Sequence, residues 1–216
     1  MMAESVEIAE QHQSVVARFI EQARASAAVV TEVADLETAI SYTVDLCGSQ
    51  AACRLEAAGG DTNLSRDADG FREPEQTKII AAPGLDPAAY KLLNKRCGAH
   101  GFICIDSGMR SPLSGVDIGF SYADIGIAET GTLVLNCPGE ELRLATMICE
   151  CHVCVLPKSK IVKDGFAAEE QLQRFMRKAP NYTAFITGPS RTADIERVLT
   201  IGVHGPLELH ILMMEG

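Results

Sequence analysis

Residues 148–157 read ICECHVCVLP and bring together four side chains that can bind a soft metal ion: Cys149, Cys151, His152 and Cys154. Thiolate and imidazole groups are the ligands that zinc prefers. The alternative is a buried β-strand that uses cysteine as a small apolar residue. In a strand, the side chains of Cys149 and Cys151 would point to one face and those of His152 and Cys154 to the other. Four ligands divided in this way cannot reach one ion, so we predict a strand without a metal.

A second group of polar residues follows an apolar run in the stretch ADIGIAETGTLVL. Glu129 ends that run, and Gly131 permits a tight backbone geometry after it. A carboxylate in this position could act as a general base or nucleophile, with Thr130 and Gly131 binding ligand. The alternative is an exposed hairpin turn without a catalytic role.

The stretch TGPSRTADIE, residues 187–196, runs from a predicted strand through a glycine into a predicted helix. Ser190 could cap that helix, and the free amides of its first turn, together with Arg191, would form an anion site. The alternative is a purely structural cap, whose acidic residues complement the helix dipole. The candidate ligand-binding residues of this stretch are Ser190, Arg191, Thr192 and Asp194.

A single histidine, His204, lies in the glycine-flanked stretch GVHGP between a predicted helix and the last predicted strand. It could exchange protons near neutral pH, with Gly205 as a ligand-binding neighbour, or it could simply bond to the backbone of a loop. We predict that Glu129, Arg191 and His204 meet in one cleft at the ends of the strands, as in other open α/β sheets.

The elements that must position these residues alternate between strand and helix from Lys78 to the end of the chain. This pattern predicts an α/β fold with a mostly parallel sheet flanked by helices. Strands are predicted at 78–82, 102–106, 123–129, 132–136, 148–157, 159–164, 182–187 and 207–214. Helices are predicted at 86–97, 138–147, 167–178 and 190–202.

The first part of the chain, residues 1–56, is predicted to be helical. Apolar residues between 4 and about 30 fall near one helical face, and Asp35 can cap a second helix. Residues 57–77 are polar and predict a long loop. Residues 78–216 form the predicted α/β domain, and we expect the whole chain to fold as one compact domain.

The composition excludes several classes of protein. Of the 216 residues 47% are hydrophobic, which is typical of a soluble globular protein, and the net charge of −10 repels nucleic acid. The sequence shows neither a signal peptide nor an apolar run of about 20 residues that could span a bilayer. We therefore expect a cytoplasmic protein, in which the eight cysteines remain reduced.

The order of four motifs resembles the LUD-domain family, typified by lactate utilisation protein C. These motifs are AETGTLVL, then RLATM ahead of HVCVLPKSKIV, then TGPSRTADIE, then GVHGPLELHILM, between about Lys78 and the end of the chain. The resemblance implies the fold shared by glucosamine-6-phosphate deaminase (NagB), ribose-5-phosphate isomerase (RpiA) and CoA transferases. It also implies a role in oxidising L-lactate to pyruvate with two iron–sulfur partner proteins. The clusters belong to the partners, so we expect no cofactor in this chain.

Three functions follow as hypotheses. The leading one is a subunit of a lactate-oxidising system that binds L-lactate, or a similar small anion, or its iron–sulfur partner subunits. The second is an independent enzyme of the CoA-transferase or sugar-phosphate-isomerase type that uses Glu129, by analogy with the fold. The third is a thiol-based metal or redox protein that uses Cys149, Cys151, His152 and Cys154. No G-x-G-x-x-G motif follows a strand, so the sequence has no nicotinamide or flavin signature.

Overall fold

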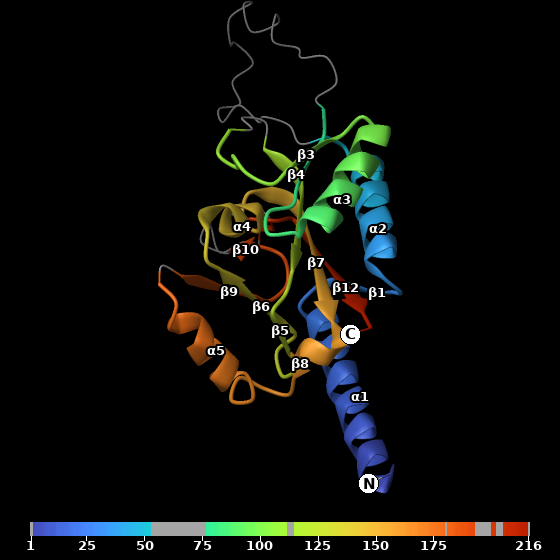
Figure 1. Cartoon of the computed structure of the whole chain (residues 1–216), viewed down its shortest axis with the longest axis vertical. Coiled ribbons are helices and arrows are strands. Elements are labelled where there is room, and N and C mark those ends of the chain that lie inside the picture. Colours follow the sequence, from blue (N-terminus) through green and yellow to red (C-terminus); the bar gives the residue numbers. More distant parts are fainter. Residues whose placement is uncertain are drawn as a thin grey trace, which may run out of the picture.

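The described residues form two larger β-sheets, a separate pair of short strands and five α-helices (Figure 1). The computed structural model describes residues 2–52, 77–111, 115–179, 181–192, 200–201 and 205–215. The predicted loop at 57–77 lies almost wholly outside the described residues. No helix in the described part of the chain is long and apolar enough to cross a membrane.

The larger sheet has six strands in the order β1-β12-β7-β4-β2-β3, and all its neighbouring strands run parallel. This sheet confirms the predicted α/β class. Its strands are β1 (Val29–Val33), β12 (Glu208–Met214), β7 (Cys149–Pro157), β4 (Val116–Tyr122), β2 (Ile79–Ala81) and β3 (Ile103–Ile105).

The central strand β7 is buried on both faces, as is usual in a parallel sheet covered on both sides. Val153 and Val155 pack in a core cluster beneath α2 (Leu36–Ser49) and α3 (Pro87–Ala99), which lie side by side (Figure 1). Cys154 and Leu156 pack in the opposite cluster, beneath α1 (Met2–Ala25) and the smaller sheet. The run of cysteines is therefore a two-faced strand, as predicted.

The smaller sheet has four strands in the order β8-β5-β6-β9. Their bounds are Ile161–Val162 for β8, Ile125–Ile127 for β5, Thr132–Cys137 for β6 and Tyr182–Ile186 for β9. β5 and β6 pair antiparallel, and Ile127 lies opposite Thr132, so residues 128–131 form the turn of a hairpin. These four strands were predicted from the sequence, but a second sheet separate from the larger one was not.

The remaining helical elements are short: α4 (Glu140–Ala145), α5 (Glu169–Met176) and a 3₁₀ turn at Lys158–Lys160. Two predicted helix starts are confirmed by their caps. The side chain of Asp35 accepts a hydrogen bond from the Thr38 amide at 2.8 Å, and Asp86 accepts from the amides of Ala88 and Ala89. Pro87 occupies the first turn of α3, where its missing amide proton has no cost.

Two predictions for the main sheet were wrong. The helix expected to reach residue 30 ends at Ala25, because Ala27 has a φ of 66° and the Ala28 amide turns back to the carbonyl of Ala23. The β-branched residues that follow form β1, which pairs with β12. β4 was not predicted at all, although it joins β7 to β2 in the sheet. Its sequence VDIGFSY alternates apolar and polar residues, which is a strand signal, but no element had been assigned to it.

The prediction of a helix at 190–202 was also wrong, because both ends of this range form short strands. Arg191–Thr192 forms a short strand, β10, which pairs antiparallel with β11 (Thr200–Ile201). The amide of Ser190 donates to the carbonyl of Pro206 at 2.9 Å, so this amide is not a free donor at a helix start. The proposed helix-capping role of Ser190 therefore does not hold.

Two glycines allow α1 to approach the smaller sheet closely. Gly131 has a φ of +66°, and a Cβ atom there would lie 2.3 Å from the backbone nitrogen of Ala23 in α1. Gly188 has a φ of +72°, and its Cβ would lie 2.1 Å from the carbonyl oxygen of Ser26. The turn at 128–131 and the loop after β9 both require glycine, because backbone from the end of α1 occupies the space of a side chain.

We predict that Gly131→Ala lowers the free energy of unfolding by about 2–4 kcal/mol, through the left-handed backbone and the overlap with α1. Urea unfolding followed by circular dichroism measures this change. Gly98→Ala, inside α3 with no atom within 4 Å of the added carbon, is the control. It should be neutral or stabilising by up to about 1 kcal/mol. Equal effects of both substitutions would contradict the packing argument.

Candidate functional site

A cavity of about 210 Å³ lies between the larger and the smaller sheet. Its walls come from the connection before β7, from His152 in β7, from the end of β9 with the following loop, and from the segment before β12. The cavity lies beside the amino ends of β7 and β12. Ligand sites of open parallel sheets usually lie at the carboxyl ends, so this position differs from the expectation.

Among the described residues, His152 is the one imidazole that lines this cavity, and its side chain is fully enclosed, with 1% of the residue exposed. A hydrogen bond of 2.8 Å joins its Nε2 to the hydroxyl of Ser121 in β4. Its Nδ1 is buried and has no hydrogen-bond partner among the described residues. Burial lowers the pKa of His152 to about 4, so the ring is neutral at physiological pH. A buried polar atom without a partner is unfavourable, which sets His152 apart from the other residues of the cavity wall.

A chain of threonine hydroxyls extends from the hairpin turn to the cavity wall. The hydroxyls of Thr130 and Thr132 lie 2.6 Å apart, and those of Thr132 and Thr187 lie 2.7 Å apart. Thr187 lines the cavity. Hydrogen bonds along such a chain fix the direction of the last hydroxyl, so the Thr187 side chain is oriented by residues outside the cavity.

Two residues predicted to bind ligand, Ser190 and Gly205, lie together in the cavity wall. A Cβ atom on Gly205 would lie 3.1 Å from that of Ser190, so the absence of a side chain at this position lets the two segments pack closely. Thr130 connects to the wall through the hydroxyl chain, whereas Gly131 serves the packing of α1.

Other predicted residues are placed differently. Glu129 is exposed in the hairpin turn, its amide donates to the carbonyl of Lys163, and it does not line the cavity. The guanidinium of Arg191 lies beside Gly188 and donates to the carbonyl of Ser26, which ties this loop to the end of α1. His204 and Asp194 lie outside the described residues, as does the side chain of Thr192.

The residues of β7 that carry thiols or imidazole do not gather around one point. Cys151 faces α2, whereas His152 and Cys154 face the smaller sheet. Burial raises the pKa of the Cys151 and Cys154 thiols to about 12, and raises that of Cys149 still further above its ordinary value. Without a bound metal ion, these thiols are therefore protonated at neutral pH.

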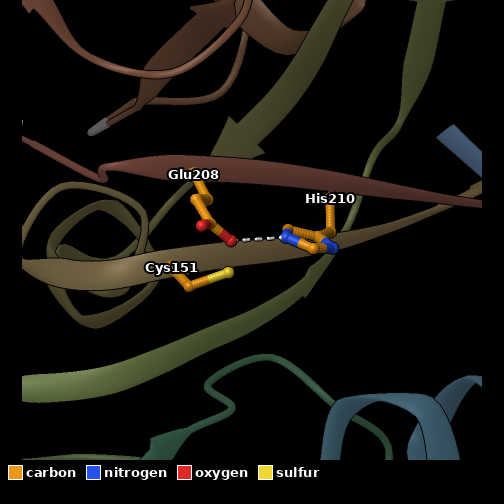
Figure 2. Close-up of side chains that lie close together, drawn as sticks. All are labelled: Cys151, Glu208 and His210. Carbon is orange, nitrogen blue, oxygen red and sulfur yellow. Dashed lines mark hydrogen bonds and ion pairs between the residues drawn. The ribbon is translucent and has the colours of Figure 1, made fainter. Parts of the chain in front are cut away.

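A different cluster forms on the α2 face of the sheet, where Cys151, Glu208 and His210 lie close together (Figure 2). One possible ligand atom from each lies within 4.8 Å of the others. Among the described residues it is the one group of three or more histidine, cysteine or acidic side chains whose ligand atoms lie this close together. Glu208 and His210 were not among the candidates predicted from the sequence. Their spacing of two in a predicted strand was the available signal, because it places both on one face.

The sequence profile of the LUD domain matches residues 16–214. The chain belongs to the LUD domain family. The match confirms the resemblance noted in the sequence and extends it to α1, β1 and α2, where no motif had been identified.

Curated relatives of this LUD-domain chain match over part of their length. An uncharacterized protein of Neisseria meningitidis serogroup B is 38% identical over 108 residues, covering 50% of this chain and 46% of that protein. Lactate utilization protein C of Macrococcus caseolyticus is 32% identical over 102 residues, covering 46% of this chain and 44% of that protein. The chain thus matches less than half the length of either relative.

A solved structure shares the fold of this LUD-domain chain along nearly its whole length. It is the crystal structure of a DUF162 family protein from Deinococcus radiodurans, with a TM-score of 0.60. The similarity covers 94% of this chain and 98% of that chain, at 17% sequence identity. At this identity the comparison establishes the common architecture alone.

We predict that His152 makes the stability of this LUD-domain protein depend on pH. The pKa of about 4 in the folded state lies below the ordinary value of 6.5, so unfolding takes up a proton between these values. Stability is full above pH 6.5 and falls as the pH drops, with a total loss of about 3 kcal/mol reached near pH 4. Urea unfolding at several pH values measures this loss.

His152→Gln is the control for this pH dependence, because glutamine can bond to Ser121 and does not titrate. The difference between wild type and this variant isolates the histidine from the carboxylates that titrate in the same range. Parallel pH profiles for the two proteins would contradict a buried, neutral His152.

Proposed function

We propose that this LUD-domain chain takes part in lactate utilisation by binding a small 2-hydroxy or 2-oxo carboxylate in the cavity beside His152. Family membership and relatives named lactate utilization protein C support the process. The observation that supports the location is His152, which lines the cavity wall and whose buried Nδ1 has no partner among the described residues.

The size and chemistry of the cavity wall fit a small ligand that carries a hydroxyl or carbonyl oxygen next to a methyl group. Its volume of about 210 Å³ lies below the about 300–1,000 Å³ that is typical of sites for drug-sized molecules. A neutral imidazole can donate to or accept from a hydroxyl or carbonyl oxygen, and the Thr187 hydroxyl can do the same. Met147, Phe185 and Leu209 provide apolar surface for a methyl group.

A carboxylate needs a cation or several hydrogen-bond donors. Arg191 follows the loop that forms the cavity wall, and its side chain is exposed. In the proposal, its guanidinium exchanges the carbonyl of Ser26 for the ligand carboxylate, because a carboxylate is charged and can accept two parallel bonds from arginine, whereas the carbonyl is neutral. Arg191 then has the ligand-binding role expected from the sequence, but without the free amides of a helix start beside it.

The oxidation itself involves partners in this proposal. Conversion of L-lactate to pyruvate releases two electrons and two protons. The electrons pass to iron–sulfur clusters in partner proteins, as the family resemblance implies. The rival enzyme based on Glu129 has no support from the geometry, because that carboxylate lies exposed in a turn and does not line the cavity.

We predict that Thr187→Val and His152→Gln each weaken L-lactate binding about tenfold, the effect of losing one hydrogen bond of about 1–1.5 kcal/mol. Isothermal titration calorimetry on the purified chain measures the affinity. Propionate lacks the 2-hydroxyl group, so wild type should bind it more weakly, and neither substitution should change its affinity further. Thr183→Val, in β9 shortly before Thr187 but outside the cavity wall, is the control. Unchanged lactate affinity in both cavity variants would contradict the site.

The partner hypothesis gives a separate prediction. Purification of the chain from its native cells under anaerobic conditions should retain iron–sulfur proteins. The assembly should reduce an electron-accepting dye when L-lactate is added, whereas the isolated chain should not. A chain that oxidises lactate without any partner would contradict this division of roles, even if the cavity binds lactate as proposed.

A further inference from the structure

The cluster of Cys151, Glu208 and His210 is built by the pairing of two parallel strands. In the register of β7 with β12, Glu208 lies opposite Cys151. His210 is two residues further along β12 and therefore shares the face of Glu208. Figure 2 shows the three side chains pointing toward one another across the two strands. This face is covered by α2, on the opposite side of the sheet from the cavity at His152.

Both buried members of the cluster are held in fixed positions. Cys151 is 1% exposed and His210 is 5% exposed. The hydroxyl of Tyr42 in α2 lies 2.7 Å from Nδ1 of His210, and Nε2 of His210 lies 2.9 Å from a carboxylate oxygen of Glu208. The imidazole is thus oriented by a hydrogen bond at the nitrogen that faces away from Glu208, as is common for metal-binding histidines.

The end of α2 closes the cluster from a second direction. The side-chain amide of Gln50, the C-cap of α2, donates to Glu208 at 3.4 Å and also contacts the Cys151 thiol. Lys78 donates to the backbone carbonyls of Cys47 and Gln50, which fixes this end of the helix. The surroundings of the three side chains therefore come from elements that the rest of the fold holds in place.

We propose that Cys151, Glu208 and His210 bind a zinc ion through the thiolate, a carboxylate oxygen and Nε2. Thiolate, imidazole and carboxylate are the three ligand types that zinc uses in proteins, and sites with three protein ligands keep a fourth position open. The side chain of Glu208 is 52% exposed, so solvent reaches the group and water would take that position. The two acidic ligands balance the double positive charge of the ion.

The rearrangement that binding requires is small. Ligand atoms around a tetrahedral zinc lie about 3.3–3.6 Å apart, given the usual metal–ligand bond lengths. The three candidate atoms already lie within 4.8 Å of one another. Glu208 and His210 must move slightly apart, and the thiol must move slightly inward. Zinc binding through Nε2 also requires that the proton of the neutral His210 ring lies on Nδ1, where the Tyr42 hydroxyl can accept the hydrogen bond.

The site differs from the one considered from the sequence alone. That hypothesis placed four ligands within β7, and their division between two faces argued against a metal. The present cluster uses one residue of β7 and takes the other two from the neighbouring strand. A metal bound here would not involve His152, Cys149 or Cys154.

Zinc and cobalt binding to the tag-free full-length chain tests the proposal. After removal of metal with a chelator, wild type should take up one zinc ion per chain, measured by competition with a chromophoric chelator and by elemental analysis. Cobalt(II) in its place should show the intense near-ultraviolet charge-transfer band of a thiolate ligand. Cys151→Ser should abolish that band, and Glu208→Gln and His210→Gln should each weaken zinc binding at least tenfold.

Matched variants separate the site from general effects on folding. Cys154→Ser changes a thiol on the other face of the same strand and should leave both metals bound as in wild type. Tyr42→Phe should weaken zinc binding by about 10–100-fold through the lost support of His210. Glu208→Gln changes a half-exposed side chain, so its effect does not depend on unfolding, and melting temperatures check every variant. Wild type without stoichiometric zinc, or zinc binding that Glu208→Gln leaves unchanged, would overturn the proposal.

Discussion

The pairing of β7 with both β4 and β12 is the constraint on which the two candidate sites depend. A strand with parallel neighbours on each edge and cover on each face has no exposed backbone, and its side chains alternate between two interiors. His152 points into the layer shared with the smaller sheet, and Cys151 points into the layer beneath α2. Two chemically different environments therefore arise from adjacent residues, and a shift of one residue in register would exchange them.

The smaller sheet gives this LUD-domain fold its cavity. A fully parallel sheet with helices on both faces would pack apolar helix surface against His152. Instead, the β5–β6 hairpin and β9 cover that face, and the loop after β9 meets the segment before β12 through Ser190 and Pro206. The helix α1 secures this arrangement, since its end lies against Gly131 and Gly188. Gly131 and Gly188, which lie in the family motifs, thus allow the close packing that forms the cavity wall.

The many cysteines of this chain have a simple physical explanation. The cysteines at 47, 97, 137, 149, 151 and 154 are all buried, where they fill small spaces between sheet and helices as other small apolar residues would. Burial raises the pKa of most of these thiols, which keeps them protonated. Cys151 is distinguished from the others only by its neighbours in β12. Its chemistry depends on the partners across the strand pair rather than on the run of cysteines in which it stands.

Local sequence signals predicted a large part of the fold. The caps at Asp35 and Asp86, and the two-faced character of β7, depend on residues within a few positions of one another, so they could be found without the tertiary structure. The same reasoning failed at β1 and β10. There, strand pairing decided the conformation: β1 pairs with β12 near the end of the chain, and β10 pairs with β11 a few residues further on. The helical pattern or cap signal in the sequence was only a weak preference.

Motifs in the chain were enough to identify the family, the fold class and the candidates Thr130, Ser190 and Gly205. Which of the residues meet depends on the tertiary structure. Ser121 reaches His152, and Glu208 reaches Cys151, through strand register between segments far apart in the chain. Only the fold removed Glu129 from the cavity, by placing it in an exposed hairpin turn. Contacts between distant segments follow from sheet pairing and helix packing, which no local pattern of residues specifies.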